Sequence, residues 1–304
     1  MIKGNKQQIY VIGDLMLDEY WNCESNRISP EAPVPIMQVK SIETRLGGAG
    51  NVARNLASLE VETILIGYIA DDAVGKEIQY LVNSQNKINP IFVFGKKHPS
   101  TKKLRIISRN KHVLRVDQEE ILTEDYFCPE HLEIKPNEGD IIIFSDYNKG
   151  FIGDISPYLK EFRKQGIFVA VDPKGEDFSK YMYASLITPN EKEFQAIVGV
   201  CTNENQVTEK AFGLIDSLKL EALLLTRGEK GLSLFFNNSK FDFSATAKEV
   251  MDVTGAGDTV IASFIYMFIQ SKDLIKSAEF SNKCAGIVVS KFGTSHLNLT
   301  EINF

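Results

Sequence analysis

The chain has 304 residues, of which 43% are hydrophobic and 24% charged, a balance typical of a globular protein with a sizeable buried core. Its net charge of −6 argues against non-specific binding to nucleic acid, which favours a basic surface. Scattered cysteines, no signal peptide and no apolar run long enough to span a bilayer predict a cytoplasmic protein with free thiols and no membrane partner.

Short apolar runs alternate with longer amphipathic segments along the chain. The predicted strands are Ile9–Ile12, Ile64–Ile66, Ile141–Phe144, Phe168–Val171, Leu186–Ile187 and Leu223–Leu225. The predicted helices are Gly50–Ser58, Asp154–Gln165, Glu191–Val198, Thr208–Leu218 and Thr259–Gln270. This alternation predicts an α/β fold with helices on both faces of a mostly parallel sheet, in a single domain over residues 1–304.

Two stretches, at about 15–40 and 91–116, depart from this alternation. The first is rich in proline turns, and the second predicts extended strands interrupted at residues 97–99, Lys-His-Pro. We interpret both as insertions that form a small β-sheet lid over the active site. The alternative is a sheet that serves only as an oligomer contact. The two interpretations are compatible, because an exposed edge of the lid sheet would also favour a homodimer.

Residues 252–258 read Asp-Val-Thr-Gly-Ala-Gly-Asp and lead into the last predicted helix. A glycine turn that opens a helix presents unpaired backbone N–H groups at the positive end of the helix dipole, where a phosphate binds well. Small residues let a phosphate oxygen approach the backbone closely. Helix capping alone would also favour an acid at Asp258, so the turn by itself predicts an anion site without fixing its use.

The run 252–259 resembles the second signature of the ribokinase-like (PfkB) carbohydrate kinases. The resemblance implies a three-layer α/β/α domain with a small β-sheet lid, and ATP-dependent phosphorylation of a sugar. It implies that Asp258 takes the proton of the attacking hydroxyl, while the N–H groups of Gly255, Ala256 and Gly257 stabilise the transferred phosphoryl group. An aspartate suffices as the base, because phosphoryl transfer depends on positioning and electrostatics more than on a strong base.

Residues 47–51, Gly-Gly-Ala-Gly-Asn, resemble the first signature of the same family. This implies that Gly47 and Gly48 let the backbone approach the sugar and that Asn51 hydrogen-bonds its hydroxyls. Glycines at this spacing would equally suit a tight turn that packs a helix on a strand. The sequence departs from the signature at Glu60 and Ala70, which lie beyond the implied contact.

The resemblance extends to a nucleotide-binding half. Asn190 and Glu193 match an Asn-x-x-Glu element, which implies that they organise the Mg²⁺ of MgATP through water; the alternative is a simple helix N-cap. The other residues implied to bind the nucleotide are Lys174, Glu191, Lys192, Thr226, Gly228, Gly231 and, in the base pocket, Asn282. Some family members bind K⁺ near the equivalents of Asp252 and Gly293, and the sequence leaves open whether this chain does.

Four strings narrow the resemblance to family members that act on D-glycero-β-D-manno-heptose 7-phosphate. They are Arg27–Pro35, Lys103–Asn110, Ser145–Gly150 and Asp172–Phe178. The implied reaction phosphorylates the anomeric O1 and gives heptose 1,7-bisphosphate for the synthesis of ADP-heptose, a lipopolysaccharide core precursor. Bifunctional relatives carry a further nucleotidyltransferase domain, whereas the resemblance here implies a stand-alone kinase. The substrate contacts expected from these strings and from the first strand are Asp14, Asp18, Arg27, Asp146 and Lys149.

The charges of the second insertion agree with a phosphorylated substrate. Alternate residues of a strand share a face, so Lys103, Arg105 and Arg109 are predicted to point the same way. Three cations on one face of an acidic protein suit a phosphate monoester, and the alternative is a charged edge strand in solvent. Asp14 is a stronger candidate than Asp18 for binding sugar hydroxyls, because it directly follows a strand, where α/β sheets bind ligands.

The sequence leaves two rival functions open: a family member that acts on fructose 1-phosphate or ribose, and a sugar-phosphate sensor without catalysis. The intact Asp258, Asn190 and Glu193 argue against the sensor. A dinucleotide-dependent oxidoreductase would need Gly-x-Gly-x-x-Gly after the first strand, where residues 13–18 read Gly-Asp-Leu-Met-Leu-Asp.

Overall fold

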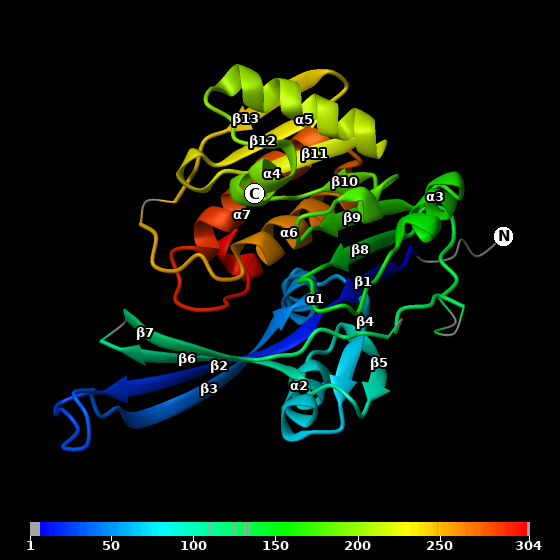
Figure 1. The fold of residues 1–304 in the computed structure, drawn as a ribbon. Helices are drawn as coiled ribbons and strands as arrows, with labels where there is room; N and C mark the ends of the chain where they lie inside the picture. The colour runs from blue at the N-terminus through cyan, green and yellow to red at the C-terminus, as the bar shows by residue number, and fades with distance from the viewer. Residues whose placement is uncertain are drawn as a thin grey trace.

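The computed structural model describes residues 7–302 except 110, 125, 131, 133 and 248, so Asn110 lies outside the described residues. The strands of its larger sheet are β1 (Ile9–Gly13), β4 (Thr63–Ala70), β5 (Ile88–Gly95), β8 (Ile141–Ser145), β9 (Phe168–Asp172), β10 (Leu186–Ile187), β11 (Ala222–Thr226), β12 (Leu232–Phe236) and β13 (Ser239–Phe243). Their order is β13-β12-β11-β10-β9-β8-β1-β4-β5 (Figure 1). All neighbours from β11 to β5 are parallel, and the β12–β13 hairpin extends the β11 edge antiparallel.

Helices cover both faces of this sheet. They are α1 (Ala49–Ser58), α2 (Ala73–Asn83), α3 (Ser156–Lys164), α4 (Glu191–Val198), α5 (Glu204–Leu218), α6 (Ala256–Ser271) and α7 (Leu274–Val288). Tyr10 and Ile12 of β1 pack in the core under α3, α4 and α5, whereas Ile9 and Val11 pack in the core under α1, α2, α6 and α7. The predicted three-layer α/β/α architecture is therefore confirmed. Within the described part of the chain, no helix is both long and apolar enough to cross a membrane.

A smaller sheet extends away from the larger one (Figure 1). Its strands are β2 (Leu15–Glu24), β3 (Gln38–Gly48), β6 (Thr101–Ser108) and β7 (Lys111–Gln118), in the order β3-β2-β6-β7. The β2–β6 pair is parallel and the two outer pairs are antiparallel. The chain enters this sheet after one residue: Asp14 lies between β1 and β2, its N–H donates to the Ser145 carbonyl (3.1 Å), and its carbonyl accepts the Ala49 N–H (3.0 Å).

The limits of the two insertions differ from the prediction. β5 pairs in parallel with β4 as an edge strand of the larger sheet, so residues 91–95 do not belong to the smaller one. The smaller sheet instead continues to Gly48 in β3 and to Gln118 in β7. A half-buried edge strand alternates buried and exposed residues much as a lid strand does, and the hydrophobic pattern does not separate the two.

Candidate active site

Asp258 lies in the first turn of α6 and is almost fully buried. Its Oδ2 accepts a hydrogen bond from Asn51 Nδ2 of α1 (2.7 Å), and its Oδ1 accepts one from the Tyr147 hydroxyl (2.8 Å). Burial raises the pKa of Asp258 to about 7, although both hydrogen bonds act to lower it and Lys103 lowers it further. A carboxylate with this pKa can take up a proton near neutral pH, as a general base must.

The glycine turn before Asp258 has the geometry of an anion site. Gly255 has a φ of 77°, and a Cβ there would lie 2.8 Å from Asn51 Nδ2, so this position requires glycine. The Ala256 N–H already donates to the Val253 carbonyl (3.2 Å). Gly255 and Gly257 are therefore better candidates than Ala256 to donate N–H groups to a phosphoryl group.

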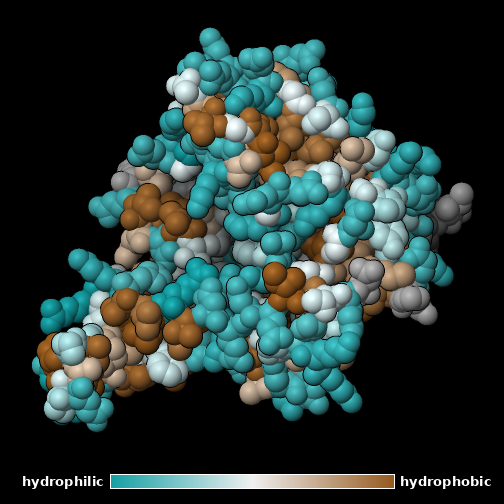
Figure 2. Space-filling view, viewed as in Figure 1, coloured by the Kyte–Doolittle hydropathy of each residue, from teal (hydrophilic) through white to brown (hydrophobic). Residues whose placement is uncertain are grey.

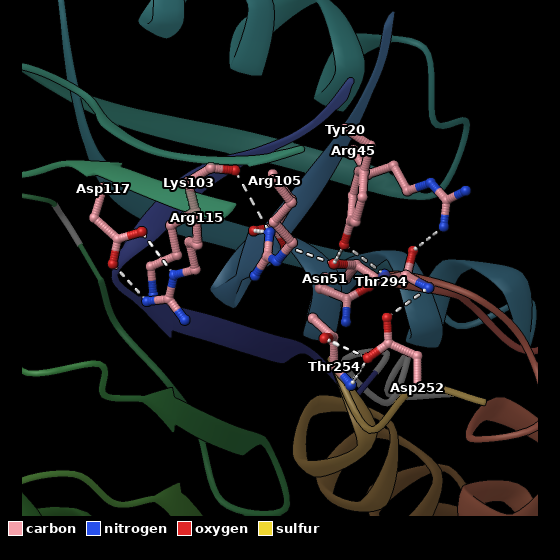
Figure 3. Close-up of polar contacts among 12 residues, drawn as sticks. Tyr20, Arg45, Asn51, Lys103, Arg105, Arg115, Asp117, Asp252, Thr254 and Thr294 are labelled. Carbon is pink, nitrogen blue, oxygen red and sulfur yellow. Dashed lines mark hydrogen bonds and ion pairs between the residues drawn. The ribbon is translucent and has the colours of Figure 1, made fainter. Parts of the chain in front are cut away.

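Asp252 holds the start of this turn in place. Its carboxylate accepts hydrogen bonds from the N–H and hydroxyl of Thr254 (2.9 and 2.6 Å) and from the Gly293 N–H (3.0 Å) (Figure 3). His112 Nε2 of β7 lies 3.3 Å from the same carboxylate, and the His112 ring stacks on Phe292. The far edge of the small sheet thus contacts the segment that leads into the base.

The small sheet presents cations to the site. Lys103 and Arg105 of β6 are both buried on the same side of the sheet, as predicted, and Arg115 of β7 pairs opposite Arg105. Lys103 Nζ stands 5.4 Å from the centre of the Tyr147 ring. Arg109 was predicted to join this face, but β6 ends at Ser108 and Arg109 is exposed in the following turn, with a φ of 51°. Arg115, half-exposed and paired with Asp117, supplies the third cation of this face instead.

Asp18 links the small sheet to the C-terminal part of the chain. Its carboxylate pairs with Arg105 and accepts the Thr294 hydroxyl (2.5 Å). Figure 3 shows Thr294 joined in turn to Tyr20 and Arg45 of the small sheet: its N–H donates to the Tyr20 hydroxyl (2.8 Å), and its carbonyl accepts from Arg45 (3.1 Å). Gly47 lies beside this cluster, because a Cβ there would come within 2.8 Å of Asp18.

Asp14 faces a loop rather than the base. Its carboxylate accepts backbone N–H groups of Tyr147 (2.8 Å), Lys149 (3.0 Å) and Phe151 (3.3 Å). Burial and the nearby charge of Asp146 raise the pKa of Asp14 to about 6 despite these bonds. Asp14 and Asp18 both have engaged oxygens, Asp14 with the 147–151 loop and Asp18 with Arg105 and Thr294, so the predicted preference for Asp14 as the sugar ligand stays a prediction.

Three other predicted sugar contacts have different surroundings. Asp146 is buried and accepts from the Lys180 ammonium (2.6 Å) and the Tyr181 hydroxyl (2.7 Å). Arg27 is exposed in the connection between β2 and β3. That connection lies at the far tip of the small sheet (Figure 1). Gly48, with a φ of 57°, forms the junction between β3 and α1, where a Cβ would meet the Asp14 carbonyl at 2.3 Å.

A pocket of about 600 Å³ opens next to Tyr147. Its walls include Lys149, Lys174 and Glu119. The Lys149 ammonium lies 2.6 Å from Glu119, while Lys174 pairs with Glu193 of α4 (2.5 Å). The pocket therefore extends from Tyr147 and Lys149, near the predicted sugar contacts, to Lys174, a predicted nucleotide residue.

The Asn190–Glu193 element forms a capping box at the start of α4. Asn190 Oδ1 accepts the Glu193 N–H (2.9 Å), and the Glu193 carboxylate accepts the Asn190 N–H (3.0 Å). Glu191 lies 3.4 Å from Arg227, and Lys192 is exposed. The alternative of a helix N-cap is therefore realised, with Glu193 also bound to Lys174.

The remaining predicted nucleotide residues line the region after β11. Thr226 pairs with Asn190 in a parallel bridge, which brings the β11 end beside α4. Gly228 begins a short 3₁₀ turn and Gly231 follows it, with φ values of 56° and 88°. Asn282 of α7 is buried, and its amide donates to the Ser244 carbonyl (2.7 Å).

Sequence reasoning missed four residues that the structure places in the site: Tyr147, Thr294, Arg115 and Asp172. Asp172 Oδ2 lies beside Gly257, and burial together with the charges of Asp258 and Glu193 raises its pKa well above the usual value. Its position at the end of β9 was a usable signal, since parallel strands place their last residues at one edge. Tyr147 lies in the Ser145–Gly150 string just after β8, but its partner Asp258 is more than a hundred residues away, and Thr294 offered no signal at all.

Comparison with known proteins agrees with this geometry. The family model described as "pfkB family carbohydrate kinase" matches residues 6–301. The chain is 42% identical over 305 residues to the bifunctional protein HldE of Actinobacillus pleuropneumoniae serotype 5b, and 43% identical over 300 residues to that of Haemophilus influenzae. These alignments cover 99% and 97% of this chain but only 64% and 62% of the relatives, so the chain spans less than two thirds of their length.

Solved structures share the fold at low sequence identity. Phosphofructokinase-2 from Escherichia coli in complex with potassium aligns with a TM-score of 0.80 at 19% identity, covering 97% of each chain. Ribokinase from Arabidopsis thaliana, complexed with ribose and ATP, aligns with a TM-score of 0.73 at 21% identity, covering 95% of this chain and 94% of that one. The family match, the HldE relatives and the ribokinase-like fold lead to one conclusion: the chain belongs to the pfkB family of carbohydrate kinases and is a sugar kinase.

Proposed function

We propose that this kinase transfers the γ-phosphate of ATP to the anomeric O1 of D-glycero-β-D-manno-heptose 7-phosphate. The observation that carries the proposal is the face formed by Lys103, Arg105 and Arg115, which lies beside Tyr147 and the base Asp258. Cations near the base suit an acceptor that already bears a phosphate. The heptose assignment itself rests on the strings Arg27–Pro35, Lys103–Asn110, Ser145–Gly150 and Asp172–Phe178.

In the proposed reaction the O1 hydroxyl gives its proton to Asp258 as its oxygen bonds to the γ-phosphorus. The bond between that phosphorus and the β–γ bridging oxygen breaks, and ADP leaves. The N–H groups of Gly255 and Gly257 would stabilise the charge that develops on the phosphoryl oxygens. The product, heptose 1,7-bisphosphate, would serve ADP-heptose synthesis.

Magnesium and potassium belong to the same proposal. Bound Mg²⁺ would neutralise charge on the β- and γ-phosphates. Among the described residues no group of three or more His, Cys, Asp or Glu could hold a metal ion, and the oxygens of Asn190 and Glu193 already serve the capping box. These two side chains therefore suit water-mediated contact with a nucleotide-bound ion. For K⁺ near Asp252 and Gly293, the Gly293 N–H and Thr254 occupy the carboxylate, so the ion would need backbone carbonyls nearby.

We further propose that the enzyme works in the cytoplasm. We also propose that it forms a homodimer through the outer face of the small sheet. The register places Ile42, Trp21, Ile106 and Leu114 in one row across all four strands, on the side away from Lys103 and Arg105. Ile42 and Leu114 are 55% and 54% exposed, and Figure 2 shows apolar surface gathered over this sheet and its tip. Such a patch is typical of a protein–protein contact. Leu114→Glu would then convert a dimer into monomers in light scattering.

An ADP-release assay with a panel of acceptors tests the substrate. Heptose 7-phosphate should give the highest kcat/KM, well above heptose without the phosphate, and ³¹P spectroscopy should show the new phosphate on C1. Faster turnover of fructose 1-phosphate or ribose would overturn the assignment. Sugar-phosphate binding without any ADP release would instead favour a catalytically silent sensor.

A further inference from the structure

Tyr147 is a titratable residue that hydrogen-bonds the proposed base directly. Its hydroxyl donates to Asp258 Oδ1 at 2.8 Å, while Asn51 occupies the other carboxylate oxygen. Burial, and then the charge of Asp258, hold the pKa of Tyr147 well above its usual value, so its hydroxyl remains a donor at any pH at which the enzyme works. The base is therefore fixed by two neutral donors from two separate elements.

The position of Tyr147 is fixed from both sides. Its backbone N–H donates to Asp14 (2.8 Å), the residue between β1 and β2, and the carboxylate of Asp14 also holds the N–H groups of Lys149 and Phe151. On the other side, Lys103 of the small sheet stands over the Tyr147 ring. The ring thus lies between the cationic face and the base. The buried Asp14 fixes the position of the Tyr147 backbone.

We infer that Tyr147 is a positioning residue for Asp258, which orients the carboxylate toward the acceptor hydroxyl and favours its ionised form. A hydrogen bond donated to a carboxylate stabilises the charged state. Without this donor, Asp258 would keep only the Asn51 bond in a buried site. The carboxylate would then be free to rotate, and more of it would be protonated near neutral pH.

Other charges around Asp258 act on the same equilibrium. Asp18 of β2 and Asp172 of β9 disfavour ionisation of Asp258, whereas Lys103 of β6 favours it. None of these groups is altered by removing the Tyr147 hydroxyl, so the change isolates one bond. Tyr147→Phe also keeps the ring beneath Lys103, which preserves the packing of the loop.

The test is the pH profile of kcat/KM for Tyr147→Phe, with the sugar phosphate that the wild-type enzyme turns over. We expect the apparent pKa of the acidic limb to rise by about one unit. kcat/KM should then be roughly tenfold lower at pH values below that pKa and far less reduced at pH 9. Tyr10→Phe is the matched control, since the Tyr10 hydroxyl donates to Gln8 at the opposite end of β1 and its removal should leave the profile unchanged. A loss that is equal at every pH, with an unmoved limb, would overturn the inference.

A second measurement does not need turnover and separates this inference from the proposed reaction. Carbon-13 spectra of protein labelled at aspartate carboxyls would follow the Asp258 titration directly, with the signal assigned by its absence in Asp258→Asn. The midpoint should rise in Tyr147→Phe. An unchanged midpoint would sink the inference even if the kinase assignment holds, whereas a raised midpoint in a protein that phosphorylates no sugar would sink only the kinase assignment.

Discussion

The acceptor half and the nucleotide half of the site hold their charges in different ways. The Asp18 and Arg105 side chains expose 4% and 7% of their surface, and Asp258 is almost fully buried. On the nucleotide side, the Lys174 and Glu191 side chains expose 46% and 31%. Buried charges are costly unless they are paired in a fixed geometry, whereas exposed ones are screened and tolerant. On the proposed assignment, the residues around Asp258 and Asp18 form the more rigid part of the site, and the nucleotide side relies on turns and helix starts.

Replacing the base should produce the largest effect. Asp258→Asn removes the only proton acceptor in the proposed reaction, and we expect kcat to fall by about 100- to 10,000-fold. Calorimetric titration should still show ATP and sugar phosphate binding, since neither site loses a cation. A variant with near-normal kcat would show that Asp258 is not the base.

The cationic face offers a test with its own control on the same strand. Lys103→Ala should raise the KM for sugar phosphate by about 10- to 100-fold, the size of one hydrogen bond to a charged group, and leave the KM for ATP unchanged. Lys102 points to the other side of the sheet and pairs with Glu19, so Lys102→Ala should change neither constant. An equal loss for ATP would place Lys103 in the nucleotide half.

The buried base should also cost stability in a pH-dependent way. The folded pKa of Asp258 is about 7, against roughly 4 for an unfolded aspartate, so the folded state binds the proton more tightly. Stability is therefore lost as pH rises from about 4 through 7. Asp258→Asn should raise the Tm by a few degrees at pH 8 and by less at pH 4.5. A gain independent of pH would contradict the raised pKa.

The capping box should give the smallest effect. Asn190→Ala removes the N-cap of α4, which costs about 1 kcal/mol of stability in urea unfolding, and should raise the KM for MgATP only severalfold. Glu209→Ala, on the exposed surface of α5 and outside the predicted nucleotide residues, is the control and should change neither quantity. If the MgATP KM rose a hundredfold or more, the nucleotide side would be as sensitive to substitution as the acceptor side, contrary to the comparison above.

Much of the fold was readable because its strands are apolar on both sides. Ile141–Phe144 is fully buried, as expected of a central parallel strand, and the predicted helix Thr259–Gln270 lies within α6. The β12–β13 hairpin was missed, although its two-residue turn, Asn237-Asn238, has the positive φ values that asparagine tolerates. The β5 strand was assigned to the wrong sheet, because register and sheet membership depend on distant partners.

The site was predictable where chemistry is local and not where it depends on packing. The Gly255–Asp258 turn carries its proposed function in consecutive residues, and the structure places Asp258 in the first turn of α6. The sequence ranked Asp14 above Asp18, yet it could not show their partners: Asp14 lies between β1 and β2 and holds the 147–151 loop, whereas Asp18 lies within β2 and pairs with Arg105. Arg115 could not be assigned to the cationic face from sequence, because its place there depends on the register that pairs it with Arg105 between β6 and β7.

The single-residue link at Asp14 limits how the small sheet can move. β2 continues β1 with no flexible connection, and Asp14 is pinned through its N–H, its carbonyl and its carboxylate. We therefore expect the small sheet to rotate as a rigid unit about Asp14, rather than to open on a flexible hinge. The ten residues of β2 span about 33 Å, so a twist of a few degrees at Asp14 displaces the tip near Arg27 by several times the motion at Asp18. A partner that binds the tip and rotates the sheet would therefore also shift Asp18, by a smaller distance than the tip itself moves.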